Sequence, residues 1–396
     1  MRMLQQIAGV VSMNLRSVPQ RFATSLVIVV GIAGVVAVLI SVLSLSRGLQ
    51  HTLASTGRDD RAIIVNKQAI DEVGSNLSRD AVLTILDAPG IARGPDGKPL
   101  ASAEMLATVN LPRRDNGMLG SLTLRGVSPQ VLVLRPELHL REGRLFRPGL
   151  REVIAGTNAQ DRYRGLGVGQ RVVFGPTEWT IVGAFDSGGG AHDSELFGDA
   201  DTVLSAYQRT TYNSLTLKLA DPGALDRLNA LLGKDPTLSV NVRRESQYYE
   251  QQSQAFSRLL AVIASLVGTI MAIGAVFAAL NTMYSAVASR TAEIATLRAI
   301  GFGATPVLLS VVTEALLLAL IGAALGATIA WLLFNGNTVS TLAGGTGLQQ
   351  VVFHLHIGAA LISVGIIWAC AVGLIGGLLP AIRAARLPVA TALRAV

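Results

Sequence analysis

Four long apolar stretches constrain the fold of this chain more than any other feature. They cover residues 22–45, 259–284, 306–334 and 357–380. A helix needs about 20 apolar residues to cross the hydrocarbon core of a bilayer. Backbone polar groups cannot be left unpaired in lipid, and a helix pairs them internally. Each stretch is therefore predicted to be a membrane-spanning helix.

The composition agrees with a membrane protein. The chain has 396 residues, of which 50% are hydrophobic and 15% are charged, whereas soluble domains are about 25% charged. The net charge of +7 points to membrane orientation and lipid contact rather than to nucleic acid. Cys370 is the single cysteine, so no disulfide can form within the chain.

The first apolar stretch is predicted to be an uncleaved membrane helix. It is longer than the apolar core of a secretory signal, which has about 7–15 residues. No A-x-A cleavage site follows it.

Basic residues predict how the helices are oriented. No Lys or Arg occurs from 335 to 356. Lys and Arg favour the cytoplasmic side, so both termini and the loop 285–304 are placed in the cytoplasm. Residues 47–257 then form a large domain on the outer side of the membrane. The basic residues that decide this are Arg2, Arg16, Arg21, Arg290, Arg298, Arg383, Arg386 and Arg394.

The region between the first two spans shows two β-α-β patterns. The first has strands at 62–65 and 103–111, with a helix opened by Ser78 and closed before Pro89. The second has strands at 213–220 and 238–242, with Asp221 as helix N-cap and Pro222 at the first position. Short β-branched strands lie between them, including a hairpin over 173–182.

The fold class is therefore an α-helical membrane protein with four transmembrane helices and an extracytoplasmic α+β domain. That domain is a split β-α-β subdomain with an inserted β-rich subdomain at about 120–205. The predicted order is an amphipathic interfacial helix, first span and stalk, periplasmic domain, stalk and second span, cytoplasmic helix, third span, periplasmic loop, fourth span and cytoplasmic tail. The corresponding ranges are 1–20, 21–58, 59–245, 246–284, 285–304, 305–334, 335–356, 357–380 and 381–396.

One acidic segment, residues 185–201, has two interpretations. It contains carboxylates, His192 and three consecutive glycines, and carboxylates bind hard cations. The spacing does not fit an EF-hand. The alternative is an acidic surface loop in which Asp199 caps the following helix, and this alternative is favoured.

The sequence holds no recognisable catalytic motif. It lacks the G-x-x-x-x-G-K-[ST] phosphate loop, H-E-x-x-H and G-x-S-x-G. We therefore expect no enzymatic activity, no metal and no cofactor in this chain.

Several residues inside the spans are candidates for helix contacts or function. Glu314 lies within the third span, where a charge is costly and is either functional or bonded to a neighbouring helix. Glycines four apart allow close helix packing. These glycines are Gly322, Gly326, Gly373 and Gly377.

The loop between the second and third spans is predicted to be a separate short helix. Residues 287–300 contain no Pro or Gly, and Gly301 suits a helix end. Thr305 is predicted to cap the next helix, with Pro306 at its first position. On a helical wheel, alanines including Ala295 and Ala299 line one face. The opposite face, suited to a groove in a protein, carries Arg290, Ile294, Leu297 and Arg298, with Glu293 at its border.

These residues resemble a known family. The stretch from 289 to 326 resembles the FtsX-type, MacB-like permeases of the type VII ABC transporter superfamily, as does the ending "PAIRAARLPVATALR". Residues 141–185 resemble the MacB-type periplasmic core, which implies that the membrane is a bacterial inner membrane and that the external domain lies in the periplasm. Phe302 departs from the small residue common in the family. The matching tail residues include Pro380, Arg383, Arg386, Pro388 and Arg394.

The resemblance implies a function. The short helix would couple to the ATPase through Arg290, Glu293, Ile294, Leu297, Arg298, Ala299 and Gly301. Two permease copies, or this chain and a paralogue, would work with two copies of a separate ABC ATPase, which binds ATP and Mg. Further partners would be a membrane-fusion protein with an outer-membrane channel, or a periplasmic lipoprotein. The ATPase would drive export or extraction by mechanotransmission through the stalks.

Three other functions are weighed against this one. An FtsX-like regulator of cell-wall enzymes would transport nothing, but such proteins usually have a smaller external domain. A membrane-tethered sensor would not need an ATPase-docking helix. An ion-coupled transporter would need paired charges inside the spans, and only Glu314 is present there.

Overall fold

The computed structural model describes residues 22–340, apart from 176 and 236, and residues 351–387, together with Gln6 and Val10. The predicted interfacial helix at 1–20 lies outside the described residues except for those two positions. The chain divides into two compact units. The helical unit comprises Met1–Arg47, Arg258–Asn337 and Leu355–Val396, and the sheet unit comprises Gly48–Ser257 and Thr338–His354.

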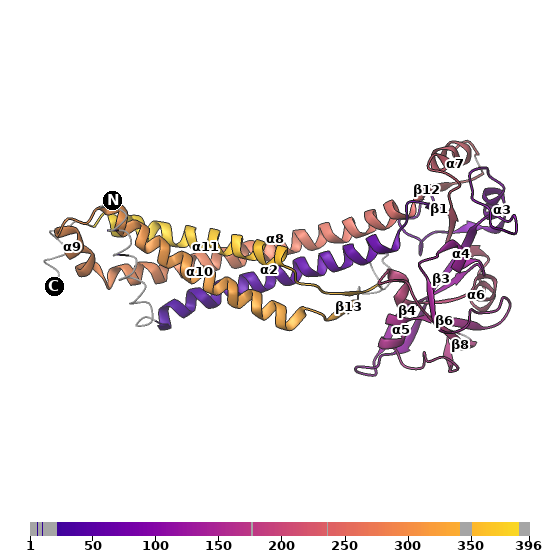
Figure 1. Ribbon diagram of the computed structural model, residues 1–396, viewed down its shortest axis with the longest axis horizontal. Helices are drawn as coiled ribbons and strands as arrows, with labels where there is room; N and C mark the ends of the chain where they lie inside the picture. The colour runs from indigo at the N-terminus through magenta and orange to yellow at the C-terminus, as the bar shows by residue number, and fades with distance from the viewer. Residues whose placement is uncertain are drawn as a thin grey trace. The chain divides into compact units, whose positions relative to one another are not determined.

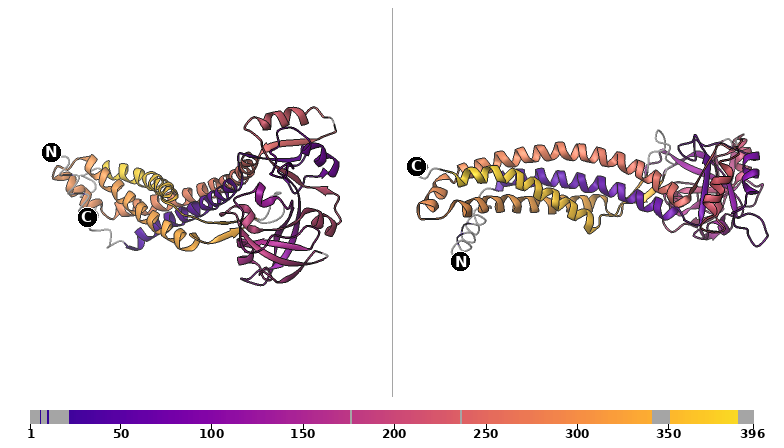
Figure 2. Two further views of the ribbon diagram at one scale, coloured as in Figure 1. Left: turned by 45° about the vertical axis from the view of Figure 1, so that its right-hand side comes forward. Right: turned by 90° about the horizontal axis from the view of Figure 1, so that it is seen from above.

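Within the described residues, four helices are long and apolar enough to cross a membrane. They are α2 (Phe22–Thr56), α8 (Glu245–Ala288), α10 (Ala304–Phe334) and α11 (Ala359–Ala385). Figure 1 shows them running lengthwise beside one another, and both views of Figure 2 agree. The short helix α9 (Thr291–Ala299) joins α8 to α10. The predicted membrane fold with four spans is confirmed.

The sheet unit is built on one mixed ten-stranded sheet in the order β12-β1-β11-β3-β4-β9-β6-β8-β5, with β7 paired to β8. The pairs β4–β9 and β6–β8 are parallel, and the other pairs in this sheet are antiparallel. Its strands are β1 (Arg61–Asn66), β3 (Ala101–Pro112), β4 (Leu119–Val127), β5 (His139–Gly143), β6 (Glu152–Gly156), β7 (Arg171–Phe174), β8 (Thr177–Asp186), β9 (Glu195–Asp199), β11 (Ser214–Lys218) and β12 (Val240–Arg244).

Short elements complete the sheet unit. The helices are α3 (Arg79–Leu86), α4 (Val131–Leu134), α5 (Thr157–Arg162), the 3₁₀ turn η2 (Ala191–Ser194), α6 (Ala200–Ala206) and α7 (Ala224–Leu232). Two small pairs are β2 (Leu77–Ser78) with β10 (Thr211–Tyr212), and β13 (Thr338–Ser340) with β14 (Val352–His354). The predicted α+β domain is thus confirmed as a fold class.

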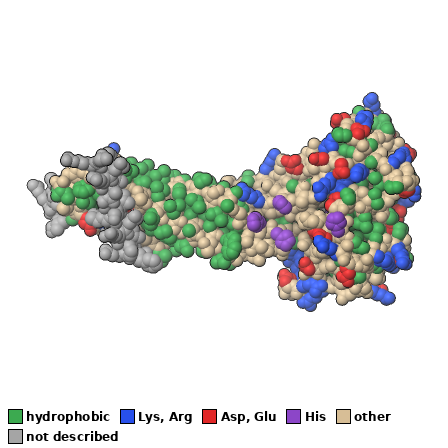
Figure 3. All heavy atoms as spheres, viewed as in Figure 1, with side chains coloured by type: hydrophobic (Ala, Val, Ile, Leu, Met, Phe, Trp, Pro, Cys, Tyr) green, Lys and Arg blue, Asp and Glu red, His purple; other side chains and the backbone are tan. Residues whose placement is uncertain are grey.

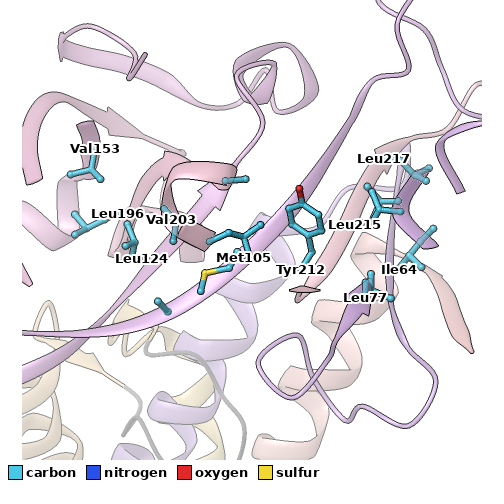
Figure 4. Close-up of a cluster of buried hydrophobic side chains, with 14 of the residues drawn as sticks. Ile64, Leu77, Met105, Leu124, Val153, Leu196, Val203, Tyr212, Leu215 and Leu217 are labelled. Atoms are coloured by element: carbon cyan, nitrogen blue, oxygen red, sulfur yellow. The ribbon is translucent and has the colours of Figure 1, made fainter. Parts of the chain in front are cut away.

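The core of the sheet unit follows the alternation of apolar residues along its strands. Leu124, Val153 and Leu196 gather with Val203 of α6, while Leu215 and Leu217 lie with Ile64 of β1 (Figure 4). These side chains are almost fully buried. On the visible face, hydrophobic side chains cover the helices, and Lys, Arg, Asp and Glu side chains are spread over the sheet unit (Figure 3).

Three predicted helix ends were wrong by a few residues. Helix α7 begins at Ala224 rather than after Asp221, because the Asp221 carboxylate bonds the Gly223 amide in a tight turn. Helix α10 begins at Ala304 with Gly303 as N-cap, so Thr305 does not cap it. Helix α11 continues through Pro380 to Ala385, which membrane helices tolerate where neighbouring helices pack against them.

Candidate functional site

The charged connection between α8 and α10 forms a helix with defined ends. Helix α8 stops at Ala288, and α9 begins at Thr291. At the other end, the amide of Phe302 donates to the Leu297 carbonyl and that of Gly301 to the Arg298 carbonyl. Gly301 has a φ of +102°, so only glycine fits this helix end without strain. The connection is therefore a short rigid element rather than a loose loop.

An ion pair ties α9 to α10. Arg290 lies 3.5 Å from Glu314 and 3.5 Å from Glu293, and the side chains of Arg290 and Glu314 are both more than nine-tenths buried. The attraction of the guanidinium offsets part of the cost of removing the carboxylate from water. Glu314 thus bonds to a neighbouring helix, which was one of its two predicted roles.

The prediction of which face of α9 is free was wrong. Ile294 is buried in the core of the helical unit, Arg290 is buried with Glu314, and Arg298 donates to the Leu387 carbonyl at 2.6 Å. The predicted docking face is thus turned largely toward the chain's own helices. The wheel could not reveal this, because Glu314, the partner of Arg290, lies on another helix.

Other side chains of α9 and its C-cap are left exposed. The Glu293 side chain is 60% exposed, and Ile300 is 68% exposed. Thr296 and Ala299 are exposed, and Leu297 is half-buried. These exposed side chains are the part of α9 and its C-cap that the described residues leave open to a partner. We call Glu293, Thr296, Ala299 and Ile300 the outer face of α9.

The predicted glycines lie at close helix contacts. A Cβ on Gly322 would be 2.9 Å from the Val29 carbonyl oxygen of α2, and one on Gly326 would be 2.4 Å from the Ala33 carbonyl oxygen. Gly373 and Gly377 of α11 would place a Cβ 2.6 Å and 2.5 Å from alanine Cβ atoms of α10. Helix α10 therefore lies close to the backbone of α2, and its alanine side chains lie against the glycines of α11. Larger residues at these glycines would prevent both contacts.

The tail residues are only partly described. Pro380 is buried within α11, and the Arg383 guanidinium lies 5.5 Å from the centre of the Tyr284 ring of α8. Arg386 is the C-cap of α11. Pro388 and Arg394 lie outside the described residues.

The sheet unit holds a buried network of ionic side chains that the sequence reasoning missed. Arg125 of β4 contacts Glu104 at 2.7 Å, Glu195 at 2.9 Å and Glu72 at 3.0 Å. Glu104 also contacts Arg135 at 2.6 Å. These side chains are at most 2% exposed. A lone arginine in the apolar strand "SLTLRGV" was the available signal, since buried charges occur almost only in pairs.

The same network reaches the first residue of α8. Glu245 lies 2.7 Å from Arg61 of β1 and 3.6 Å from Arg135. Arg61 also binds both carboxylate oxygens of Glu137. We call this set the buried ion network. Its members are Arg61, Arg125, Arg135, Glu72, Glu104, Glu137, Glu195 and Glu245.

Electrostatics keep two glutamates of the network, Glu104 and Glu195, ionised. Burial by itself would raise the pKa of Glu104, but Arg135 and Arg125 outweigh it and lower the pKa to about 2. At Glu195, burial would again raise the pKa, but Arg125 and His192 outweigh it and lower the pKa to about 2. Glu104 and Glu195 are therefore full charges held out of water.

Acid is expected to destabilise the sheet unit between about pH 4.5 and pH 2. The folded pKa values of Glu104 and Glu195 are about 2, below the unfolded value of about 4.3. Their contribution to stability is thus present above the unfolded pKa and is lost as the pH falls through the folded pKa. Asp193, whose pKa is raised by burial, contributes in the opposite direction. Unfolding midpoints measured from pH 7 to pH 2 check this, and a flat profile below pH 4.5 would contradict it.

The acidic segment 185–201 is not a surface loop, so the favoured interpretation was wrong in that respect. His192, Asp193 and Glu195 are buried. Asp193 accepts from the Ser187 and Gly189 amides, and Glu195 binds Arg125. Asp199 does cap α6 by accepting from the Thr202 amide at 3.1 Å. Among the described residues no group of three such side chains could hold a metal ion.

Two family models match the chain. The MacB-like periplasmic core domain matches residues 22–234, and the FtsX-like permease C-terminal domain matches residues 265–389. Curated relatives of similar sequence are named macrolide export ATP-binding/permease protein MacB. That of Neisseria gonorrhoeae is 26% identical, covering 92% of this chain and 56% of the relative. That of Neisseria meningitidis serogroup A is 27% identical with the same coverage. The chain thus spans about half the length of the curated relatives it matches.

A solved structure also overlaps with the chain. The periplasmic region of MacB from Actinobacillus actinomycetemcomitans matches with a TM-score of 0.37 at 16% identity, covering 51% of this chain and 96% of that chain.

Proposed function

Since the chain belongs to the family of permeases that carry a MacB-like periplasmic core domain and an FtsX-like permease domain, we propose that it is the transmembrane permease subunit of an ATP-driven exporter or extractor. The ATP and Mg are bound by a partner ABC ATPase on a separate chain. The site that receives the ATPase is α9. The single observation that carries this proposal is the exposed outer face of a short helix that is fixed at both ends.

The internal contacts of α9 explain how force enters the bundle. The Arg290–Glu314 pair joins α9 to α10, and Ile294 packs into the helical core. A displacement of α9 by the ATPase therefore moves the neighbouring spans instead of bending a flexible loop. Arg290, Ile294 and Arg298, which were predicted to dock, act here as braces. Two other residues predicted for coupling, Glu293 and Ala299, contact the ATPase together with Ile300.

Helix α8 carries the displacement onward. It is one uninterrupted helix from Glu245 to Ala288, and a continuous hydrogen-bonded helix transmits motion along its axis. Its first residue, Glu245, is held by Arg61 in the buried ion network. The network thus makes the start of α8 move with the sheet. This supports mechanotransmission to the periplasmic side as the mode of action.

The outer face of α9 is tested by reversing its chemistry. The double variant Glu293→Arg/Ile300→Asp is expected to lose at least tenfold of the ATP hydrolysis that co-purifies with the tagged wild-type chain, because it removes an apolar contact and inverts a charge. Glu178→Arg, a charge reversal at an exposed position of β8, is the control and keeps the activity. Co-purified ATPase activity equal to wild type in the double variant, with normal membrane insertion, would refute the docking role of α9.

Membrane orientation is tested by cysteine labelling. In a Cys370→Ser background, Thr338→Cys at the exposed start of β13 is expected to react with a membrane-impermeant maleimide added to intact spheroplasts. Thr296→Cys on the outer face of α9 is expected to react only after the membrane is opened. The reverse pattern of labelling would invert the proposed topology.

A further inference from the structure

Four arginines meet where α5 ends beside the β3–β4 hairpin. Arg113 and Arg114 follow β3, while Arg162 and Arg164 lie at and just after the end of α5. The two segments are paired through their backbones. The Arg114 amide donates to the Arg162 carbonyl at 2.8 Å, and the Arg164 amide donates to the Pro112 carbonyl at 2.9 Å. This pairing holds the four side chains in one small region of the sheet unit.

The Arg113 side chain is placed there by its neighbours. It lies across Gly120, where a Cβ would come within 2.6 Å of its Nε. The side chain is half-buried, and its Nε is shielded from solvent. Among the described residues Nε has no hydrogen-bond partner. Gly120 has no side chain and so leaves room for the Arg113 guanidinium. Arg113 is therefore held in a defined position instead of extending freely into solvent.

Arg162 is also half-buried, and its hydrogen-bond partner carries no negative charge. Its Nη2 donates to the Ser340 hydroxyl at 2.9 Å, a neutral partner. Burial and the nearby positive charge of Arg113 both lower the pKa of Arg162. Asp115 and Tyr163 act in the opposite direction but do not reverse the shift.

The surroundings do not neutralise the four arginines. Among the described residues, Arg114 and Arg164 bond only to backbone carbonyls. Within the part of the chain that the structure describes, no carboxylate oxygen lies within 4.0 Å of any of the four guanidinium groups. This contrasts with the buried ion network, where every arginine binds a glutamate. Partly buried charges without a counter-charge are costly, so an anion from outside the chain would be bound favourably.

We propose that Arg113 and Arg162, with Arg114 and Arg164 at the rim, form a binding site for a phosphate-type oxyanion. The planar guanidinium fork matches the oxygen geometry of a phosphate group, and the Ser340 hydroxyl adds a polar neighbour. The phosphate can be carried by a lipid headgroup or be a soluble phosphate. The lipid is the first source to test, because Ser340 follows the end of the candidate span α10 by only a few residues in the sequence. The site is independent of the ATPase-docking proposal.

The test uses the full chain purified in a maltoside detergent without phospholipid. Phenylglyoxal modifies accessible arginines, and mass spectrometry gives the rate at each position. Inorganic phosphate is added in one arm, phosphatidylglycerol in a second, and dioleoylglycerol, which lacks phosphate, in a third. We expect Arg113 and Arg162 to react at least threefold more slowly with a phosphate-bearing ligand, while the exposed Arg209 keeps its rate. Protection by inorganic phosphate identifies a soluble phosphate as the source. Protection by phosphatidylglycerol alone identifies a lipid headgroup.

A variant provides the second measurement. Arg113→Gln/Arg162→Gln is expected to lower the phosphatidylglycerol retained by the chain in native mass spectrometry at least threefold, and Arg209→Gln is the matched control for loss of charge. Unfolding curves verify that the variant is folded. Unchanged rates at Arg113 and Arg162 in every arm, equal slowing at Arg209, or equal lipid retention in both variants would overturn the proposal.

Discussion

Replacing Arg125 with methionine is expected to lower the free energy of unfolding of the sheet unit by about 3–5 kcal/mol. Arg125 contacts Glu72, Glu104 and Glu195, and all four side chains are at most 2% exposed. The methionine fills a similar volume but leaves three carboxylates without their shared cation. An uncompensated buried charge costs far more than a hydrogen bond at the surface.

Trp179 offers a direct measurement of this loss. It is fully buried in the sheet unit, stacked on Phe174, and the chain has three tryptophans in all. With Trp331→Phe and Trp368→Phe as background, guanidinium unfolding is followed by Trp179 fluorescence. Arg141→Met, which breaks an exposed pair with Asp186, is the control and should change the free energy by about 1 kcal/mol or less. Equal effects of the two substitutions would mean that the network adds no special stability.

Gly326→Ala in α10 is expected to destabilise the helical unit by about 1–3 kcal/mol. The new Cβ would lie 2.4 Å from the Ala33 carbonyl oxygen and 3.0 Å from the Ala33 Cα of α2. Backbone atoms cannot rotate away, so the two helices must separate. Separation removes packing contacts, which are a main force that joins helices within lipid.

Gly274→Ala in α8 is the matched control. A Cβ at this position has no atom of the described residues within 4 Å, and alanine has the higher helix propensity. Its stability should equal or slightly exceed that of the wild type. Unfolding of each variant in detergent, followed by circular dichroism, compares the two. Indistinguishable midpoints would show that α2 and α10 do not depend on close approach at Gly326.

Much of the fold follows from patterns that are local in sequence. The four apolar stretches predicted the four long helices, and alternating strands with turn residues predicted the α+β domain. Gly301 was placed correctly at a helix end because its left-handed backbone is a local property. The wrong helix starts at Ala224 and Ala304 came from competing local turn geometries that one sequence cannot rank.

The candidate sites depended more on long-range pairing. The docking face of α9 was predicted on the wrong side of the helix. Glu314, the partner of Arg290, is on another helix and so does not appear on a helical wheel. The metal interpretation of segment 185–201 arose because His192 and Glu195 are natural ligands. In the fold, Glu195 instead binds Arg125, 70 residues away.

The sequence by itself therefore determined the number of spans, the domain class, the resemblance to the permease family and the existence of a charged helix between two spans. These depend on hydrophobic period and length, which any stretch of chain carries on its own. Only the tertiary structure decided which side of that helix is exposed, which glycines meet a backbone, and which arginines have partners. Those properties depend on groups far apart in the chain, and a guanidinium becomes a brace or a binding site according to whether a carboxylate lies beside it.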